Sequence, residues 1–266
     1  MKIPRSHPRY ESLMRREQLV QAWRTGVVAT EGLIAHGRGE AWDYLFGEGT
    51  CAPALVAERT AAAYLLAAKH PAISVNGNVA ALAHREVVRL AKAIPAVIEV
   101  NLFHRSEDRV KRIARLLERS GARGVLGPRP NARIPGLESK RAMSHRGGVF
   151  GADVVLVPLE DGDRAEALVR MKKTVISIDL NPLSRTSQQA TVPIVDELTR
   201  ALRNVEKFVT ELKSDPAESA RLRTSYRKVG NLRALYSFLE WRLDRLRRTA
   251  TPGSPRRKAR DARRKG

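Results

Sequence analysis

Three short apolar runs between residues 153 and 199 constrain this chain more than any other part of its sequence. The runs cover 154–159, 175–178 and 192–195, and polar residues follow each of them. Runs this short, rich in valine and isoleucine, are typical of strands buried on both faces. The helical pattern at 164–173 separates the first two runs, which predicts a parallel strand–helix–strand unit. Ligands bind beyond the carboxyl ends of such strands, so we expect a site at the polar clusters.

The same alternation of strands and helices precedes this stretch. Its predicted elements are strands at 72–75 and 96–100, helices at 79–93 and 105–120, and a short strand at 124–127. The pattern predicts an α/β fold with a Rossmann-like, mostly parallel sheet flanked by helices. Residues 127–150, rich in basic side chains, are predicted to be a long loop of the kind that is functional or disordered.

The two ends of the chain are predicted to be helical. The helices expected there are 10–23, a short one from Thr30, 52–68, 195–213 and 231–248. The glycine-containing segment 36–50 is a weak candidate for a phosphate loop, because its spacing fits neither the dinucleotide fingerprint nor the P-loop pattern. We expect one α/β domain over 1–248, in which 1–70 is the helical N-terminal part and 71–248 the Rossmann-like part. Residues 249–266 are expected to form a basic disordered tail.

The charge of the chain raises the question of nucleic acid. The 266 residues have a formal net charge of +21, and residues 242–266 alone hold eleven Lys or Arg against two Asp. A tail of this kind predicts non-specific contact with polyanions. Only 5% of the residues are aromatic and none lies among the basic residues of the tail, which disfavours base stacking.

Several kinds of protein are disfavoured by what the sequence lacks. Its apolar runs are too short for a membrane span, and its first residues lack the apolar core of a secretory signal. Cys51 is the only cysteine, which fits a small buried residue and a reducing compartment, so we expect a cytoplasmic protein without membrane contact. The histidines show no zinc spacing, and no metal site is predicted.

The sharpest local cluster is Asp179-Leu180-Asn181 with Ser184-Arg185-Thr186, directly after the second run. A carboxylate at a strand end accepts hydrogen bonds from ribose hydroxyls, and an arginine and a threonine a turn later reach a phosphate or a base edge. The alternative is that the acid and the amide cap the loop while the arginine is solvated. From the sequence alone the two interpretations are about equally supported.

Two other clusters have weaker functional interpretations. The acids at 160–163 could hold Mg²⁺ across phosphates, although acids at a helix N-terminus are more often stabilised by the helix dipole. The turn Asn76-Gly77-Asn78 between a strand and a helix could hold an anion with its main-chain N–H groups. Arg16 and Arg38, taken singly, are arginines of the kind that is usually solvated.

Longer segments carry a family resemblance. These are IPRSHPRYESLMRRE (3–17), GLIAHGRGEAWDYLFGE (32–48), HPAISVNGNVAAL (70–82), NARIPGLESKRA (131–142), ADVVLVPLEDGDRAEAL (152–168) and KTVISIDLNPLSRTSQQATVPIVDE (173–197). They resemble archaeal phosphopantothenate synthetase, the 4-phosphopantoate–β-alanine ligase of coenzyme A biosynthesis. The resemblance implies a Rossmann-like homodimer that joins 4-phosphopantoate to β-alanine, converting ATP to AMP and diphosphate through an acyl-adenylate.

The resemblance also implies a set of site residues. Those matching nucleotide contacts of the family are Arg16, Arg38, Asp179, Leu180, Asn181, Arg185, Thr186, Asp196 and Glu197. Mg²⁺ is expected with the triphosphate. For the phosphate of phosphopantoate we expect Asn76, Gly77 and Asn78 or Arg133, and the sequence identifies no general base. The alternative function is a nucleic-acid-binding protein with a basic tail, while a nicotinamide oxidoreductase is disfavoured by the missing glycine fingerprint.

Overall fold

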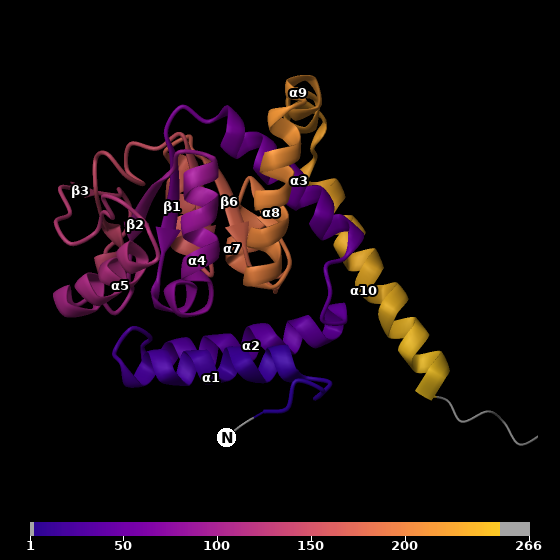
Figure 1. Cartoon of the computed structure of the whole chain (residues 1–266). Helices are drawn as coiled ribbons and strands as arrows, with labels where there is room; N and C mark the ends of the chain where they lie inside the picture. Colours follow the sequence, from indigo (N-terminus) through magenta and orange to yellow (C-terminus); the bar gives the residue numbers. More distant parts are fainter. Residues whose placement is uncertain (1–2, 251–266) are drawn as a thin grey trace, which may run out of the picture.

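The computed structural model describes residues 3–250 (Figure 1). Its main sheet has five strands in the order β2–β1–β5–β6–β7, and every pairing within it is parallel. The strands are β1 (Pro71–Val75), β2 (Val97–Val100), β5 (Val154–Pro158), β6 (Thr174–Ile178) and β7 (Val192–Ile194). The predicted α/β class with a mostly parallel sheet is confirmed.

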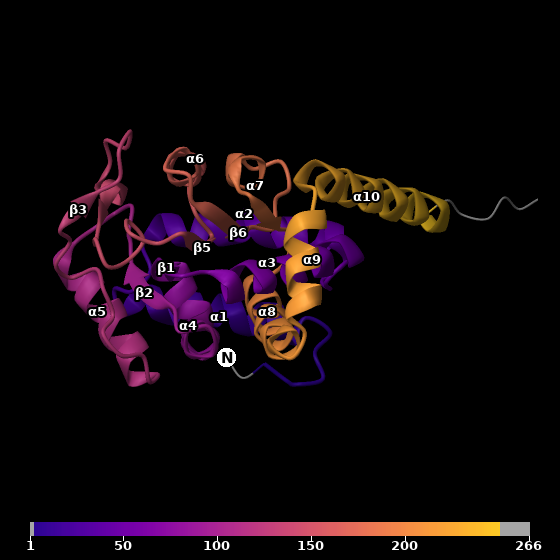
Figure 2. The same cartoon turned by 90° about the horizontal axis from the view of Figure 1, so that it is seen from above.

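Helices cover both faces of this sheet. They are α4 (Gly77–Ala93), α5 (Glu107–Arg119), α6 (Gly162–Arg170), α7 (Arg185–Gln189) and α8 (Leu198–Lys213). Figure 2 shows α6 and α7 on one face and α4 and α8 on the other. On β5, Val155 and Val157 pack in one apolar cluster with Leu168 of α6, while Leu156 packs in the other cluster with Val87 of α4. The uninterrupted apolar runs are therefore explained by burial on two faces.

The remaining helices surround this core. They are α1 (Tyr10–Arg24), α2 (Thr30–Phe46), α3 (Ala52–Ala67), α9 (Pro216–Ser225) and α10 (Lys228–Ala250). Helices α1 and α2 lie side by side below the sheet, and α10 extends away from the body in both views (Figures 1 and 2). Phe46 of α2 and Leu235 of α10 share a small apolar cluster that joins the two ends of the chain.

The chain changes direction across the sheet at β1. It continues from β1 to β2 on one side, whereas β5, the next strand of the sheet in sequence, pairs with β1 on the other side. Asn76, directly after β1, donates its side-chain amide to the main-chain oxygen of Leu159, directly after β5, over 2.8 Å. The carboxyl ends at such a switch point are the usual place for a ligand in open α/β sheets.

Three local predictions were wrong or incomplete. The segment 36–50 was expected as a loop, but α2 continues through it to Phe46 and ends at Gly47, whose φ is 92°. The short strand at 124–127 is a single bridge between Leu126 and Glu99. Helices α7 and α9 were not predicted, and α8 begins at Leu198, three residues later than expected.

The predicted loop 127–150 is ordered around a buried acid. It contains the two-stranded antiparallel pair β3 (Ala132–Arg133) and β4 (Met143–Ser144), joined through a 3₁₀ turn, η1 (Lys140–Ala142). Glu99 of β2 accepts hydrogen bonds from Ser144 Oγ and the N–H of Val149, each over 2.8 Å. A carboxylate buried in this way requires such donors, and their positions fix the loop on the edge of the sheet.

At the C-terminus, α10 runs two residues beyond the helix end expected at 248. The rest of the expected disordered tail lies outside the described residues. Within 3–250, no helix has the length and the apolar character that crossing a membrane requires.

Candidate functional site

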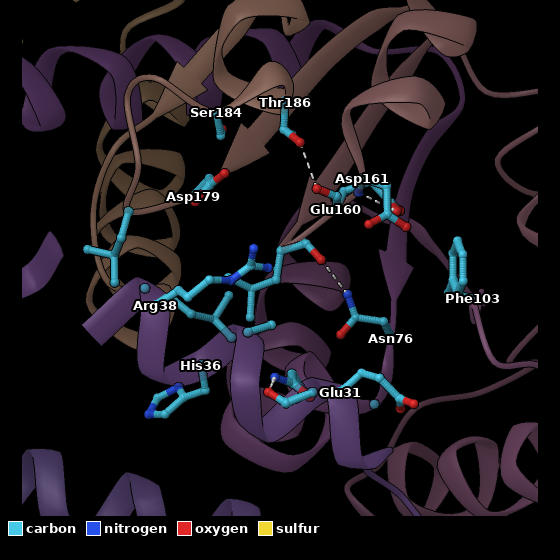
Figure 3. Close-up of a pocket in the computed structure, with 18 of the residues that line it drawn as sticks. Glu31, His36, Arg38, Asn76, Phe103, Glu160, Asp161, Asp179, Ser184 and Thr186 are labelled. Atoms are coloured by element: carbon cyan, nitrogen blue, oxygen red, sulfur yellow. Dashed lines mark hydrogen bonds between the residues drawn. The ribbon is translucent and has the colours of Figure 1, made fainter. Parts of the chain in front are cut away.

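A cavity of about 920 Å³ lies where the sequence predicted a site, at the carboxyl ends of the strands. One wall consists of the turns that follow β1, β5 and β6, and the facing wall is α2, which crosses these strand ends (Figure 3). Helix α2 is fixed in that position at both ends. Asn78 of α4 donates its amide to the main-chain oxygen of Gly32 over 2.8 Å, and Asp43 forms an ion pair with Arg200 of α8.

The turn after β6 is held rigidly by its own polar groups. Asp179 Oδ1 accepts from the N–H of Asn181 over 3.1 Å, and Ser187 Oγ donates to the main-chain oxygen of Asn181 over 2.9 Å. Thr186 Oγ1 donates to the main-chain oxygen of Glu160 over 2.7 Å, which ties this turn to the one after β5. Burial raises the pKa of Asp179, against hydrogen bonds from Ser184 and Asn181 and the charge of Arg38.

Among residues 3–250, three charged groups of the cavity wall, Asp179, Arg38 and Arg109, have no ion-pair partner. Among the acids of the wall in the described residues, Glu160 and Asp161 contact arginines and Glu197 contacts Arg15. Asp179 has no cationic partner, and Glu31 contacts only His104, which is a cation only when protonated. Arg38 extends from α2 into the cavity (Figure 3), and no carboxylate of residues 3–250 lies within ion-pairing distance of it. Charged groups that are not yet compensated are those that gain most from a ligand.

The two acids that come first after β5, unlike Asp179, form ion pairs with arginines. Glu160 is fully enclosed between Arg141 of η1 and Arg164 of α6, and both contacts are ion pairs. Burial alone would raise the pKa of Glu160, but the two arginines outweigh it and lower that pKa. Among residues 3–250 no three His, Cys, Asp or Glu side chains are arranged to hold a metal ion. Glu160 is therefore a buried charge held by two arginines, an arrangement that neither interpretation of the acids at 160–163 included.

Most residues expected to bind ligands line this one cavity. They are Arg38, Asn76, Gly77, Asn78, Asp179, Leu180, Asn181, Arg185, Thr186 and Glu197. Arg185 does so while paired with Glu166 of α6. Leu180 faces Gly39 of α2, where an added Cβ would lie 3.7 Å from Leu180 Cδ1. Segments more than a hundred residues apart in sequence are thus brought to one site.

Three of the expected residues lie outside the cavity wall. Arg16 of α1 binds Glu40 of α2, with its Nη2 2.7 Å from the carboxylate. Asp196 is buried behind the wall, where it accepts from Thr50 Oγ1 over 2.6 Å and pairs with Arg200. Arg133 of β3 donates through Nη2 to the main-chain oxygens of Leu137 and Glu138 and is not part of the cavity wall.

The cavity also contains residues that the sequence had not singled out. These are Glu31, Phe103, His104, Arg109 and Arg141. Phe103, His104 and Arg109 follow β2 or lie in the first turn of α5, so the strand-end rule applied to β2 would have indicated them. His36 of α2 lines the wall as well, and burial lowers its pKa against the opposing charges of Glu40 and Glu197.

The fold and the cavity define an α/β protein with a polar cavity at the carboxyl edge of a parallel sheet. The family model described as phosphopantothenate/pantothenate synthetase matches residues 53–241 of the chain. The chain therefore belongs to this family.

Curated relatives extend the likeness beyond the range of the family model. A protein of Methanospirillum hungatei named 4-phosphopantoate–β-alanine ligase is 54% identical over 91% of this chain and 98% of its own length. Proteins with the same name from Methanosarcina mazei and Thermococcus kodakarensis are 56% and 49% identical, over 84% and 96% of this chain and 88% and 98% of their own lengths. The family suspected from the sequence is confirmed.

Proposed function

We propose that this protein is an ATP-dependent ligase that condenses 4-phosphopantoate with β-alanine to 4′-phosphopantothenate, a step of coenzyme A biosynthesis. The observation that carries this proposal is the likeness to ligases of that name over nearly the whole chain. The cavity supports it, because its wall offers an unpaired acid and unpaired arginines at the carboxyl edge of the sheet. Residues 1–248 would act as one ligase unit, with the N-terminal helices supplying one wall of the site.

The chemistry requires activation of a carboxylate. In the proposed reaction a carboxylate oxygen of phosphopantoate attacks the α-phosphorus of ATP, and diphosphate leaves. The nitrogen of β-alanine then attacks the acyl carbon, AMP leaves, and the amine loses one proton. Holding the two reactants in one cavity lowers the entropic part of the barrier.

The nucleotide is proposed to lie between α2 and the turn after β6. Asp179 would accept hydrogen bonds from the ribose hydroxyls, since it has no ion pair and one of its oxygens faces no main-chain donor. Arg38 and Arg185 would contact the phosphates, for which the guanidinium geometry is suited. Leu180, Asn181, Thr186 and Glu197 complete this part of the wall. Arg16 and Asp196 would support it from behind, through Glu40 and Arg200.

Mg²⁺ is proposed to bind chiefly to the phosphate oxygens of ATP. Hard cations prefer oxygen ligands and retain several waters, so one protein carboxylate is sufficient. Asp161 is the candidate, because it lines the cavity close to the start of α6 and pairs with Arg141 through Oδ2 only. The ion would neutralise charge on the leaving diphosphate.

The test is product analysis with purified protein, ATP, 4-phosphopantoate and β-alanine. The proposal expects AMP and diphosphate in amounts equal to the amide formed. It also expects exchange of labelled diphosphate into ATP when phosphopantoate is present and β-alanine is omitted. Release of ADP and phosphate instead would mean an acyl-phosphate route, and absence of any amide would refute the ligase itself.

We also propose a cytoplasmic homodimer. The described part of α10 exposes Trp241, Leu243 and Leu246, each with about half of its surface accessible. Apolar side chains grouped on one protruding helix support a protein contact. Light scattering after size exclusion should give twice the chain mass of 29.6 kDa, and a monomer at micromolar concentration would contradict the dimer.

A further inference from the structure

We propose that Arg109 binds the phosphate group of phosphopantoate and so makes the ligase select the phosphorylated acid over the unphosphorylated one. This inference rests on the proposed function. It goes beyond it by assigning a residue, and a reason for substrate choice, to the end of the cavity away from Asp179.

The balance of charge in the cavity wall points to Arg109. Four arginines of the described chain line the cavity, and two of them, Arg141 and Arg185, are held by carboxylates. The other two, Arg38 and Arg109, have no carboxylate within ion-pairing distance in the part of the chain that the structure describes. The reaction brings two phosphorylated substrates into one cavity. Because Arg38 lies beside Asp179, where the nucleotide is proposed, Arg109 remains for the second one.

Arg109 is held in place by groups that leave its charge uncompensated. Its Nη2 donates to the main-chain oxygen of Val27 over 3.3 Å, and its Nη1 donates to that of His104. Carbonyl groups orient a guanidinium without cancelling its charge, and a guanidinium has five N–H donors. Two of these are used, so a phosphate oxygen can still be bound while the side chain stays in its present position.

The start of α4 is built to admit this guanidinium. A Cβ at Gly77 would lie 2.5 Å from the main-chain oxygen of Val27 and 3.2 Å from Arg109 Nη2. Glycine at this position therefore lets Val27, Arg109 and the first turn of α4 approach one another. The turn Asn76-Gly77-Asn78, expected from the sequence to hold an anion, and Arg109 thus line the same end of the cavity.

The surroundings of Arg109 favour an anion there. Burial lowers the pKa of Arg109, against the charge of Glu31, which means that the cation is partly desolvated without a direct counter-ion. Glu31 itself contacts His104 over 3.6 Å and is largely exposed. A phosphate bound between Arg109 and the start of α4 would supply the missing negative charge.

The test compares two acids on two arginine variants of the full chain. Arg109→Gln should lower kcat/KM for 4-phosphopantoate by roughly 10- to 100-fold, as expected for a lost charge-assisted hydrogen bond. It should leave kcat/KM for unphosphorylated pantoate and the KM for ATP within about twofold, since neither depends on the phosphate of the acid. Arg109→Lys, which keeps the charge, should recover part of the loss.

Arg112→Gln is the matched control. Arg112 lies on the next turn of α5, donates to the main-chain oxygen of Thr25 over 2.9 Å, and is not part of the cavity wall. It anchors the same connection between α1 and α2 without facing the ligand. Its variant should keep the preference for the phosphorylated acid.

Calorimetric titration of 4-phosphopantoate and of pantoate into each variant provides a readout that does not depend on turnover. Equal losses for both acids in Arg109→Gln, or the same loss in Arg112→Gln, would overturn the inference while the ligase stands. If the wild-type chain neither binds phosphopantoate nor forms amide, the proposed function itself has failed, which is a distinguishable result.

Discussion

Asp179 and Arg38 face the same space from the end of β6 and from α2 (Figure 3). Neither has an ion-pair partner among residues 3–250, and both are proposed to bind the nucleotide. Arg38→Met should raise the KM for ATP by roughly 10-fold or more, because a cation that contacts phosphate is lost. The melting temperature should stay nearly unchanged, since Arg38 is exposed. Arg24→Met, on the exposed end of α1, is the control, and an equal rise in KM there would contradict the assignment.

Glu58 of α3 gives a prediction about pH. It is fully buried, and burial together with the neighbouring Asp196 raises its pKa to about 9, although Asn204 donates to it over 2.9 Å. The folded chain therefore keeps a proton that the unfolded chain releases above about pH 4.5. The free energy of unfolding should fall as pH rises from about 4.5 to about 9, by roughly 1 kcal/mol per pH unit, and this dependence ends above that range.

Glu58→Gln tests whether this carboxyl group makes the free energy of unfolding fall as pH rises. The amide imitates the protonated acid, so the free energy of unfolding of the variant should not fall as pH rises. The variant should also be more stable than the wild type at pH 8. Denaturant titrations at pH 5, 6.5 and 8 measure the slope. Glu107→Gln, an exposed acid on α5, should keep the wild-type slope. A wild-type slope in Glu58→Gln would show that this carboxyl group does not control the dependence.

At the residue scale, the sequence predicted the residues of the cavity best where polar side chains directly follow a strand. Asp179, Asn181 and Thr186 follow β6, so the strand-end rule predicts them at the carboxyl edge of the sheet, where they line the cavity. Arg109 and Arg141 were not indicated, because one lies inside a charged helix and the other inside an irregular loop. Which of many arginines is left unpaired is decided by tertiary contacts, and no sequence pattern reports these.

At the scale of elements, the contact between α6 and α7 shapes the turn after β6, where the nucleotide is proposed to bind. A Cβ at Gly162 would lie 2.5 Å from Arg185 Cβ and 3.0 Å from its main-chain carbon. Gly162→Ala should therefore push α7 away, destabilise the fold by about 1–3 kcal/mol and raise the KM for ATP.

Gly37→Ala is the matched control for that substitution. Gly37 lies within α2, and a Cβ there would meet nothing within 4 Å. Alanine in an exposed helix interior gains about 0.5–1 kcal/mol over glycine, so this variant should melt at a higher temperature. If both variants changed stability in the same direction, the steric explanation for Gly162 would be refuted.

Helix α2 shows why local composition misled the prediction. Its glycines lower helix propensity, but propensity is a weak effect that tertiary contacts override. Asp43 pairs with Arg200, Phe46 packs against α10, and the main-chain oxygen of Gly32 accepts from Asn78. Helix α7, with five residues, is too short for a period of 3.6 to be visible in the sequence.

For the whole molecule, the order of the strands in the sheet could not be predicted from the sequence. The alternation of elements predicts a parallel sheet, yet the placement of β5 beside β1 depends on packing between distant segments. The placement of α1 and α2 against the strand ends also depends on packing between distant segments. The architecture was therefore predictable as a class, and the geometry of the cavity was not.

The basic C-terminal residues give a prediction for the complete chain. Removing residues 251–266, which hold seven Lys or Arg and one Asp, should leave the kinetics of amide formation within about twofold. The reason is that the cavity is built by residues between 29 and 198. Retention of the full chain on RNA that weakens with salt and is lost on truncation would support polyanion contact. A large loss of ligation would show that these residues serve the reaction.

Two strand spacings separate β1, whose end lies beside Arg109, from β6, whose end carries Asp179. Neighbouring strands lie about 4.8 Å apart, so these two ends are roughly 10 Å apart. A substrate anchored by its phosphate at the first end must extend its carboxylate toward the α-phosphorus held near the second. The distance between the two strand ends would then set the length of carbon backbone that the acid needs. Phosphorylated acids that are too short would bind without being activated.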